Sequence, residues 1–422
     1  MPTEALEAAG GLEGPLGATA AGVLRHEAIP FVSYPYEWPW GMLRDAALLQ
    51  LELLAAALGE GMILKDSSPY NVQWRGARPV FVDVGSFEEL REGEPWVGYR
   101  QFCMLYLYPL LFQAYRDVPF HPWLRGAIDG ITPDQCASML GGGDLRRPGV
   151  FTHVRMHARL ESRHADRAGE VRDELQAAGF KRELIEANVR GLQKLIGKLA
   201  WEPASTVWTE YGHDNSYSDE DGERKRAFVR EAVSGGGFRL CWDLGCNDAT
   251  YSRIALEGAE HVVAVDGDQG LVELVYRRLR DEGETRILPL TMNLADPSPN
   301  LGWRGLERRG LVERGRPDLV LCLALVHHIA ISAGVPVREW VEWLAGLGAT
   351  LVIEFPTRED PMVRRLLAGR RPGANPDYEL GHFEACLERA FVVERRERLA
   401  SGTRVLFLAR PRASANGGAP IL

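Results

Sequence analysis

The stretch that decides the fold runs from residue 238 to residue 252 and reads FRLCWDLGCNDATYS. An apolar run ends in Asp243, a sharp turn containing Gly245 follows, and a helical pattern begins after the turn. A second apolar run, residues 261–266, ends in another acid, Asp266. Two parallel strands would thus each deliver a carboxylate at the carboxyl edge, where open α/β sheets bind ligands. Such a pair suits a ligand that carries an amine and a ribose diol.

The rest of the second half alternates strand and helix patterns, which is typical of a parallel sheet covered by helices on both faces. The expected parallel strands are residues 238–244, 261–266, 286–291, 318–324 and 349–355. Two final apolar runs, residues 391–399 and 403–410, are joined through Ser401 and Gly402. So short a link requires an antiparallel pair.

Residues 205–411 resemble the class I S-adenosylmethionine-dependent methyltransferases. The resemblance rests on DLGCND at 243–248, on Asp266, on Asn293, on LCLALVHH at 321–328, and on the closing antiparallel pair, which dinucleotide dehydrogenases lack. It implies an α/β fold with a Rossmann-like seven-stranded methyltransferase sheet whose last strand is antiparallel. It also implies S-adenosylmethionine as cofactor and a single displacement that moves the methyl group to an acceptor.

The resemblance assigns the amino-acid and ribose parts of the cofactor to the first two strand ends. Asp243 pairs with the ammonium group, directly or through water, and Gly245 lets the backbone approach closely. Asn247 and Asp248 hold the amino-acid end, and Asp266 accepts both ribose hydroxyls. A single acid at a strand end is often only a helix cap, but two acids with a glycine turn between them favour the cofactor.

The resemblance assigns the adenine and the methyl-donating end of the cofactor to the ends of the next strands. Asn293 is the candidate for the adenine amine, with Leu294 against the ring, and Asp296 is a neighbouring alternative to Asn293. Leu323 and Ala324, at the end of the fourth strand, would line the methyl-donating end.

A dinucleotide dehydrogenase is the obvious competitor. Its G-x-G-x-x-G fingerprint admits a pyrophosphate, whereas the turn after Asp243 has one of the three glycines, and Ala249 stands where a further glycine is common. Asp248 would also repel a phosphate. A phosphate-free ligand with a cationic head fits the turn better.

Candidates for contact with the acceptor follow the later strands. His327 and His328 come directly after the fourth strand, so either could take a proton from a nucleophile. The alternatives are that one of them caps the next helix or hydrogen-bonds the acceptor. Glu354, after the fifth strand, is a candidate to orient a substrate amine, the alternative being a charged loop in which Asp360 caps a helix. No recognisable acidic pair accompanies the histidines, so no metal is expected.

Aromatic residues offer further binding candidates. Tyr217 for the cofactor and Tyr211 for the substrate could fold over the site as a lid, or pack between domains. Tyr36 and Trp38 lie in a stretch of four large aromatics and two prolines, residues 34–40. These rings suit the wall of an acceptor pocket, and equally an extended segment that covers the core.

The first half, residues 1–204, predicts a mainly helical α+β domain that shapes the acceptor site. Its patterns predict a helix over residues 45–58, a hairpin around residues 75–78, and two helices in 152–200 broken near Gly179. Residues 412–422 have little to pack and are expected to form a flexible tail.

One motif of this half resembles the catalytic-loop and metal-binding segments of protein-kinase-like folds. Asp66 and Asn71 have the Asp-x-x-x-x-Asn spacing, and Asp83 opens an Asp-Val-Gly segment. Lys65 stands where His-Arg is usual and no glycine-rich phosphate loop is found, so phosphoryl transfer is not expected. One hypothesis is a related scaffold reused for substrate recognition, and another is a non-catalytic regulator that binds ATP with magnesium. An unrelated helix-turn-hairpin is the alternative to both.

Chain length and net charge limit the number of domains and the class of acceptor. A chain of 422 residues predicts two domains. A formal net charge of −9 gives no broad attraction to nucleic acid or anionic lipid. We therefore expect methyl transfer to an O or N atom of a small-molecule acceptor, as in secondary metabolism, with an RNA or protein acceptor as the second choice. The oligomeric state stays open.

Cysteine usage and hydropathy point to the cytoplasm. The six cysteines form no Cys-x-x-Cys pair, which indicates buried free thiols in a reducing compartment. The first residues lack the pattern of a signal peptide. Two strongly apolar segments, residues 46–58 and 101–115, fall short of the roughly 20 residues that a membrane span needs. Both are expected to be buried helices.

Overall fold

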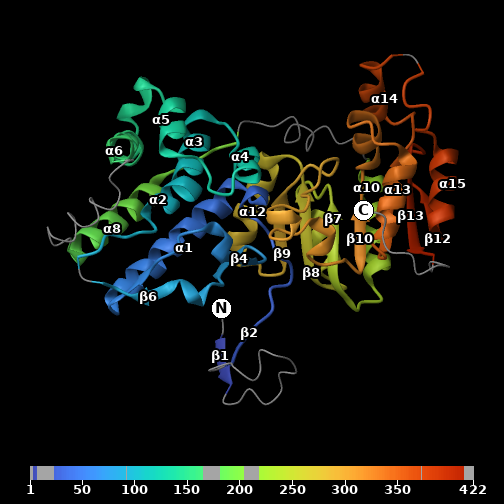
Figure 1. Cartoon of the computed structure of the whole chain (residues 1–422). Coiled ribbons are helices and arrows are strands. Elements are labelled where there is room, and N and C mark those ends of the chain that lie inside the picture. The colour runs from blue at the N-terminus through green and yellow to red at the C-terminus, as the bar shows by residue number, and fades with distance from the viewer. Residues whose placement is uncertain are drawn as a thin grey trace.

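The computed structural model describes residues 3–6, 23–91, 93–164, 181–203, 218–371 and 373–412. A helical N-terminal half lies beside a C-terminal half built on one large sheet (Figure 1). In the described part of the chain, no helix combines the length and apolar character needed to cross a membrane. All six cysteines are free and buried, as the sequence predicts.

Seven strands form the large sheet. They are β7 (Phe238–Leu244), β8 (Ala259–Asp266), β9 (Ile287–Thr291), β10 (Leu319–Cys322), β11 (Thr350–Pro356), β12 (Phe391–Arg398) and β13 (Arg404–Pro411). Their order is β12-β13-β11-β10-β7-β8-β9, and β13 runs antiparallel to both of its neighbours. The pairs among β7, β8, β9, β10 and β11 are parallel. This arrangement confirms the predicted Rossmann-like methyltransferase sheet with its antiparallel last strand.

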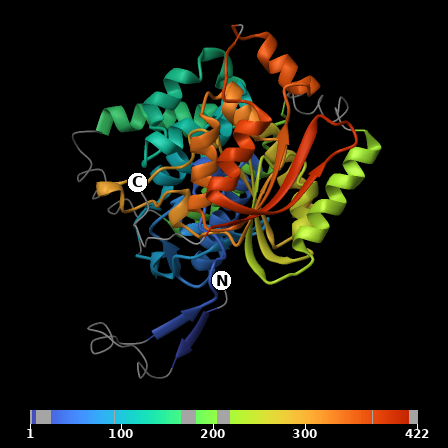
Figure 2. The ribbon, with the colours of Figure 1, turned by 90° about the vertical axis from the view of Figure 1, so that its right-hand side faces the viewer.

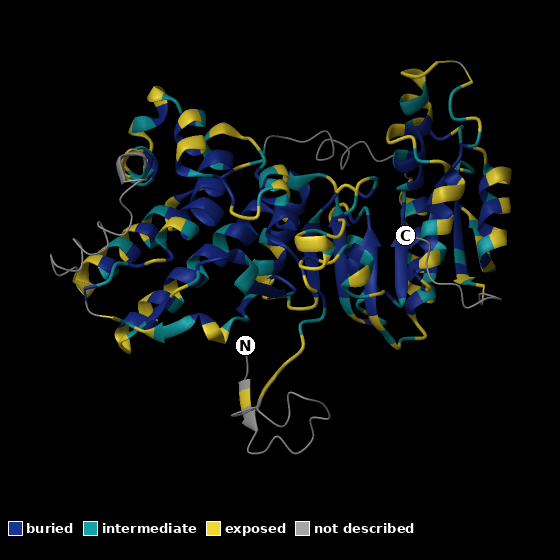
Figure 3. Cartoon of the chain, viewed as in Figure 1, coloured by how far each residue is buried: buried dark blue, intermediate teal, exposed yellow. Residues whose placement is uncertain are grey.

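The central strands are buried on both faces because helices cover each side of the sheet (Figures 2 and 3). Along β7, only the first two residues are not buried, and β10 is buried throughout. Such near-continuous apolar runs mark parallel strands with two covered faces. The helices of this half are α10 (Asp219–Val233), α11 (Thr250–Ala255), α12 (Gln269–Glu282), α13 (Val337–Gly346), α14 (Pro361–Ala368) and α15 (Leu380–Ala390). A π-helical segment, His328–Ser332, follows β10.

The N-terminal half is mainly helical, as predicted. Its helices are α1 (Trp40–Gly59), α2 (Tyr99–Phe102), α3 (Tyr108–Arg116), α4 (His121–Gly126), α5 (Pro133–Met139), α6 (Met156–His164) and α8 (Arg182–Lys198). Two π-helical segments, Cys103–Leu107 and Val150–Arg155, lie among them. Its strands are β1 (Thr3–Leu6), β2 (Val23–His26), β3 (Met62–Leu64), β4 (Val72–Arg75), β5 (Arg78–Phe81) and β6 (Phe87–Glu89).

Local signals located most of these elements. The β4–β5 hairpin is confirmed. Helix α1 begins five residues before the expected start, since Pro39 precedes its first turn and the residues from Trp40 onward are already buried. It ends as predicted, with Gly61 in the left-handed region at φ 74°. The break expected near Gly179 lies outside the described residues.

The two halves meet where α1 packs against α12. The backbone N–H of Gly41 donates to Glu273 Oε2 at 2.7 Å, and the Tyr276 hydroxyl donates to Asp45 Oδ2 at 2.7 Å. A Cβ atom on Gly41 would lie 2.8 Å from Cδ1 of Tyr276. The close approach of the two helices therefore requires glycine at position 41.

We predict that Gly41→Ala lowers the free energy of unfolding by about 1–3 kcal/mol, because the added methyl group meets the Tyr276 ring. Urea or thermal unfolding measures the loss. Gly59→Ala is the matched control, since a Cβ atom there meets nothing within 4 Å and alanine favours a helix. Equal stability of the two variants would contradict this account of the interface.

Candidate ligand pocket at the strand ends

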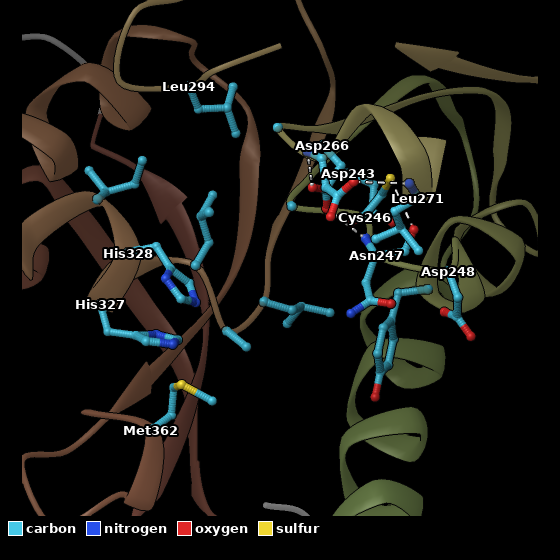
Figure 4. A pocket seen from close by; sticks show the side chains of 18 of the residues that line it. Asp243, Cys246, Asn247, Asp248, Asp266, Leu271, Leu294, His327, His328 and Met362 are labelled. Carbon is cyan, nitrogen blue, oxygen red and sulfur yellow. Dashed lines mark hydrogen bonds between the residues drawn. The ribbon is translucent and has the colours of Figure 1, made fainter. Parts of the chain in front are cut away.

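A cavity of about 880 Å³ opens at the carboxyl ends of β7, β8 and β10 (Figure 4). The nine predicted cofactor residues that the structure describes all line it: Asp243, Gly245, Asn247, Asp248, Asp266, Asn293, Leu294, Leu323 and Ala324. His327 and His328 line it as well. Tyr211 and Tyr217 lie outside the described residues. The fold thus gathers in one cavity residues that the sequence spreads over more than 80 positions.

The turn after β7 is held in a left-handed conformation. Gly245 has φ 77°, and its N–H donates to the carbonyl oxygen of Val265 on the neighbouring strand at 2.8 Å. Asn247 and Ala249 also have positive φ values, 49° and 61°. Asparagine tolerates this region, whereas alanine is strained there. Ala249, which stands where a further glycine is common, thus adopts a backbone conformation typical of glycine.

Asp266 ties the two strand ends together. Its Oδ2 accepts a hydrogen bond from the backbone N–H of Asn247 at 3.0 Å, and its Oδ1 accepts one from the N–H of Asp268 at 3.0 Å. Burial raises the pKa of this carboxyl group, and the backbone donors oppose the rise. Each oxygen retains a further lone pair, so the carboxylate can accept two hydroxyl donors from a ligand.

Asp243 is almost fully buried, with 1% of its surface exposed. Ser252 on α11, which sequence reasoning missed, donates its hydroxyl to Asp243 Oδ2 at 2.6 Å. Burial raises the pKa of Asp243 to about 6, although Ser252 and Lys225 lower it. Asp243 is therefore a carboxylate at neutral pH, but one that is short of solvation.

The remaining polar candidates near the turn hold loops as well as lining the cavity. Asp248 Oδ1 accepts from the N–H of Thr250, the first residue of α11. Asn293 Oδ1 accepts from the N–H of Ala295. Asp296, the alternative to Asn293, pairs instead with Arg125 at 3.0 Å and keeps 68% of its side chain exposed. Asn293 is thus the better placed of the two.

His327 and His328 point into the cavity from the wall opposite Asp243 and Asn247 (Figure 4). Their ring centroids are 4.1 Å apart. Burial, helped by Arg404, lowers the pKa of His328 to about 4 and that of His327 well below its usual value. Both imidazoles are therefore neutral at pH 7. In the described part of the chain, no cluster of three or more His, Cys, Asp or Glu side chains is suited to a metal ion.

Glu354 does not serve as predicted. It has no exposed surface, and Lys225 Nζ and Arg404 Nη1 bind its two carboxylate oxygens at 2.7 and 3.1 Å. Arg404 also binds Asp360 through Nε at 2.7 Å. Because both oxygens are occupied by cations, Glu354 cannot orient a substrate amine. It holds Lys225 and Arg404 instead, and these two line the cavity.

The expected acceptor wall of Tyr36 and Trp38 is also wrong. Both rings are buried, and the indole N–H of Trp38 donates to Ser33 Oγ at 2.9 Å. Trp38 packs edge-on against Trp74, and Tyr36 stacks on Tyr34. The stretch is core, which was the alternative interpretation. Among the described residues of 1–204, none lines the cavity, so these residues do not shape it directly.

The kinase-like segment is held together by turn hydrogen bonds. Asp66 Oδ1 accepts from the N–H of Ser68, and Asp83 Oδ1 accepts from the N–H of Gly85. Asn71 donates its side-chain amide to Ser86 Oγ, and that hydroxyl donates to Asp83 Oδ2. These contacts account for the spacing of the motif as local structure. ATP binding here stays a prediction.

Comparison with known proteins gives one strong relative. Nodulation protein NoeA from Rhizobium meliloti strain 1021 is 33% identical over 389 residues, which cover 92% of this chain and 81% of the relative. The chain belongs to the NoeA family. No protein-family model matches this NoeA-family chain.

Solved structures resemble about half of the chain. The N-methyltransferase NodS from Bradyrhizobium japonicum WM9 is 11% identical, with a TM-score of 0.33, over 46% of this chain and 99% of NodS. Magnesium protoporphyrin IX methyltransferase (ChlM) from Synechocystis PCC 6803 is 20% identical, with a TM-score of 0.32, over 48% and 96%. Both TM-scores are low, so the fold assignment rests on the strand order of this chain itself.

The raised pKa of Asp243 gives a pH test. The folded protein binds this proton more tightly than the unfolded chain, whose carboxyl keeps a pKa near 3.8. The stabilising contribution is complete below that value and is lost as the pH rises through about 6. Relative to Asp243→Asn, the wild-type free energy of unfolding should fall by about 2 kcal/mol between pH 4 and pH 7. Urea titrations at several pH values measure this, and a constant difference would refute it.

Proposed function

We propose that this protein is an S-adenosylmethionine-dependent methyltransferase that acts on a small molecule. The observation that carries the proposal is the pair of carboxylates, Asp243 and Asp266, at adjoining strand ends with the left-handed Gly245 turn between them. The antiparallel position of β13 in the sheet agrees with this function.

The residues present fit this cofactor better than a dinucleotide. Asp243, Asp248 and Asp266 give the turn side of the cavity a negative charge, which suits an ammonium and a sulfonium and opposes a pyrophosphate. Asp266 would hold the ribose hydroxyls, and Asp243 the ammonium group. Asn293 and Leu294 would contact the adenine. When bound, the cofactor supplies a methyl group on a positively charged sulfur.

The wall that faces the turn would receive the acceptor. Both imidazoles are neutral there; His327 is buried and His328 is partly buried, and apolar residues such as Ile329 and Met362 lie beside them. We propose that the two imidazoles contact the acceptor and orient it in line with the methyl group, since orientation supplies much of the rate of such a displacement. The cavity volume lies in the range of small-molecule sites.

Titration of S-adenosylhomocysteine into the purified protein tests the proposal. We predict binding to the wild type, weakened by about 1–3 kcal/mol in Asp266→Ala, because two charge-assisted hydrogen bonds are lost. Asp296→Ala is the matched control, as this acid lies nearby but pairs with Arg125 outside the cavity. The affinity of this control should equal that of the wild type.

Two results would contradict the proposal. If S-adenosylhomocysteine gives neither heat of binding nor a thermal shift with the wild type, the cofactor assignment is wrong. Equal affinity in Asp266→Ala and the wild type would show that the ribose does not lie on Asp266. Thermal unfolding of each variant controls for a loss of folding, since Asp266 also accepts two backbone hydrogen bonds.

A further inference from the structure

The acceptor side of the cavity is lined by cations and neutral rings. Lys225 on α10 and Arg404 on β13 line the cavity although only 4% and 3% of their surfaces are exposed. Their acidic partners, Glu354 and Asp360, have no exposed surface and do not line it. The ion cluster therefore turns its positive members toward the cavity and keeps its negative members behind them.

The cations cannot move away from this position. Arg404 is clamped between Asp360 and Glu354, with contacts of 2.7 and 3.1 Å. Lys225 is fixed by Glu354 at 2.7 Å and lies 4.7 Å from the ring centroid of Tyr251. A charge that is already oriented before the ligand arrives needs no reorganisation, which makes its field effective.

The pKa values of His327 and His328 indicate how these cations affect a neighbouring charge. Burial is the main cause of their low pKa values, and Arg404 lowers both further. The neighbouring His328 and Lys225 also lower the pKa of His327. Asp243, an acid that raises the pKa of Lys225, lies on the wall opposite the two histidines (Figure 4). At the two imidazoles, these cations therefore disfavour a positive charge.

This field discriminates between acceptors by their charge. An alkyl amine has a pKa near 10 and enters as an ammonium, whose lone pair is blocked by a proton. An imidazole whose pKa is about 4, such as that of His328, is too weak a base to remove that proton. A carboxylate or an acidic phenolate brings a free lone pair and a negative charge that the cations attract.

We infer that the methyl acceptor is an oxygen that is already anionic, in a carboxylate or an acidic phenol, drawn to the face made by Lys225 and Arg404. This inference rests on the proposed function. An oxygen lone pair forms the bond to the methyl carbon while the carbon–sulfur bond breaks and its electrons go to sulfur. No proton moves. The product is a neutral ester or ether, which the cations no longer attract, so methylation itself favours release.

Three probes of similar size test the inference on the protein loaded with S-adenosylhomocysteine: benzoate, benzyl alcohol and benzylamine. We predict that benzoate binds at least about tenfold more tightly than benzylamine, the size of a hydrogen bond to a charged group. Benzyl alcohol, which is neutral at pH 7, should fall between them. Calorimetry, or ligand-observed NMR for weak binding, gives the three affinities.

Variants assign the preference to the cluster. Lys225→Met, which removes one of the two positive charges, should reduce the preference for benzoate at least about threefold. Arg396→Gln is the control for total charge, since Arg396 pairs with Glu384 on the surface and is 48% exposed. Thermal unfolding shows which variants fold. If Lys225→Met does not fold, the wild-type ranking of the probes decides alone.

The outcomes separate the inference from the proposed function. If S-adenosylhomocysteine itself does not bind, the methyltransferase proposal fails, whatever the probes do. If it binds but benzylamine equals or exceeds benzoate, or benzoate shows no binding, only the anionic-oxygen inference is overturned. A preference for benzoate that persists in Lys225→Met and disappears in Arg396→Gln would also overturn it.

Discussion

The cavity depends on the carboxylate of Asp266 and its two backbone partners. By accepting from the N–H groups of Asn247 and Asp268, it fixes the turn after β7 against the end of β8. Gly245 and Cys246 add hydrogen bonds from the same turn to the carbonyl of Val265. Backbone donors with no partner are costly to bury, so these contacts hold the turn open in its left-handed form. The other cavity residues are positioned relative to it.

A second constraint joins the two halves into one body. Glu273, with 1% of its surface exposed, accepts from the backbone of Gly41, and Glu37 pairs with Arg314 at 2.6 Å where both side chains are 1% exposed. Buried charges of this kind are stable only when paired. The N-terminal half thus supports the β8–β9 side of the sheet through α12. The described residues of the N-terminal half do not line the cavity and affect it only by supporting the sheet.

The elements that were predicted correctly are those with strong local patterns. The apolar runs of β7 and β8, the turn at Gly245 and the short link before β13 each determine structure over a few residues. The meeting of Asp243 and Asp266 could also be predicted from the sequence, because parallel strands must bring their carboxyl ends to one edge of the sheet. Tyr36 and Trp38 were misplaced for a related reason. An aromatic ring has the same sequence signature in a pocket wall and in a core.

The sequence by itself determined the class of sheet, the two acids at its edge and the turn between them, because alternation, apolar runs and turn residues act over short distances. Only the tertiary structure decided which charges lie on the wall that carries the two histidines. Three elements far apart in the chain carry Lys225, Glu354 and Arg404. No local sequence pattern predicts that these side chains meet. Their pairing neutralised Glu354 and turned two cations toward the cavity. Charge at a site is set by which side chains share a buried space, and only folding decides that.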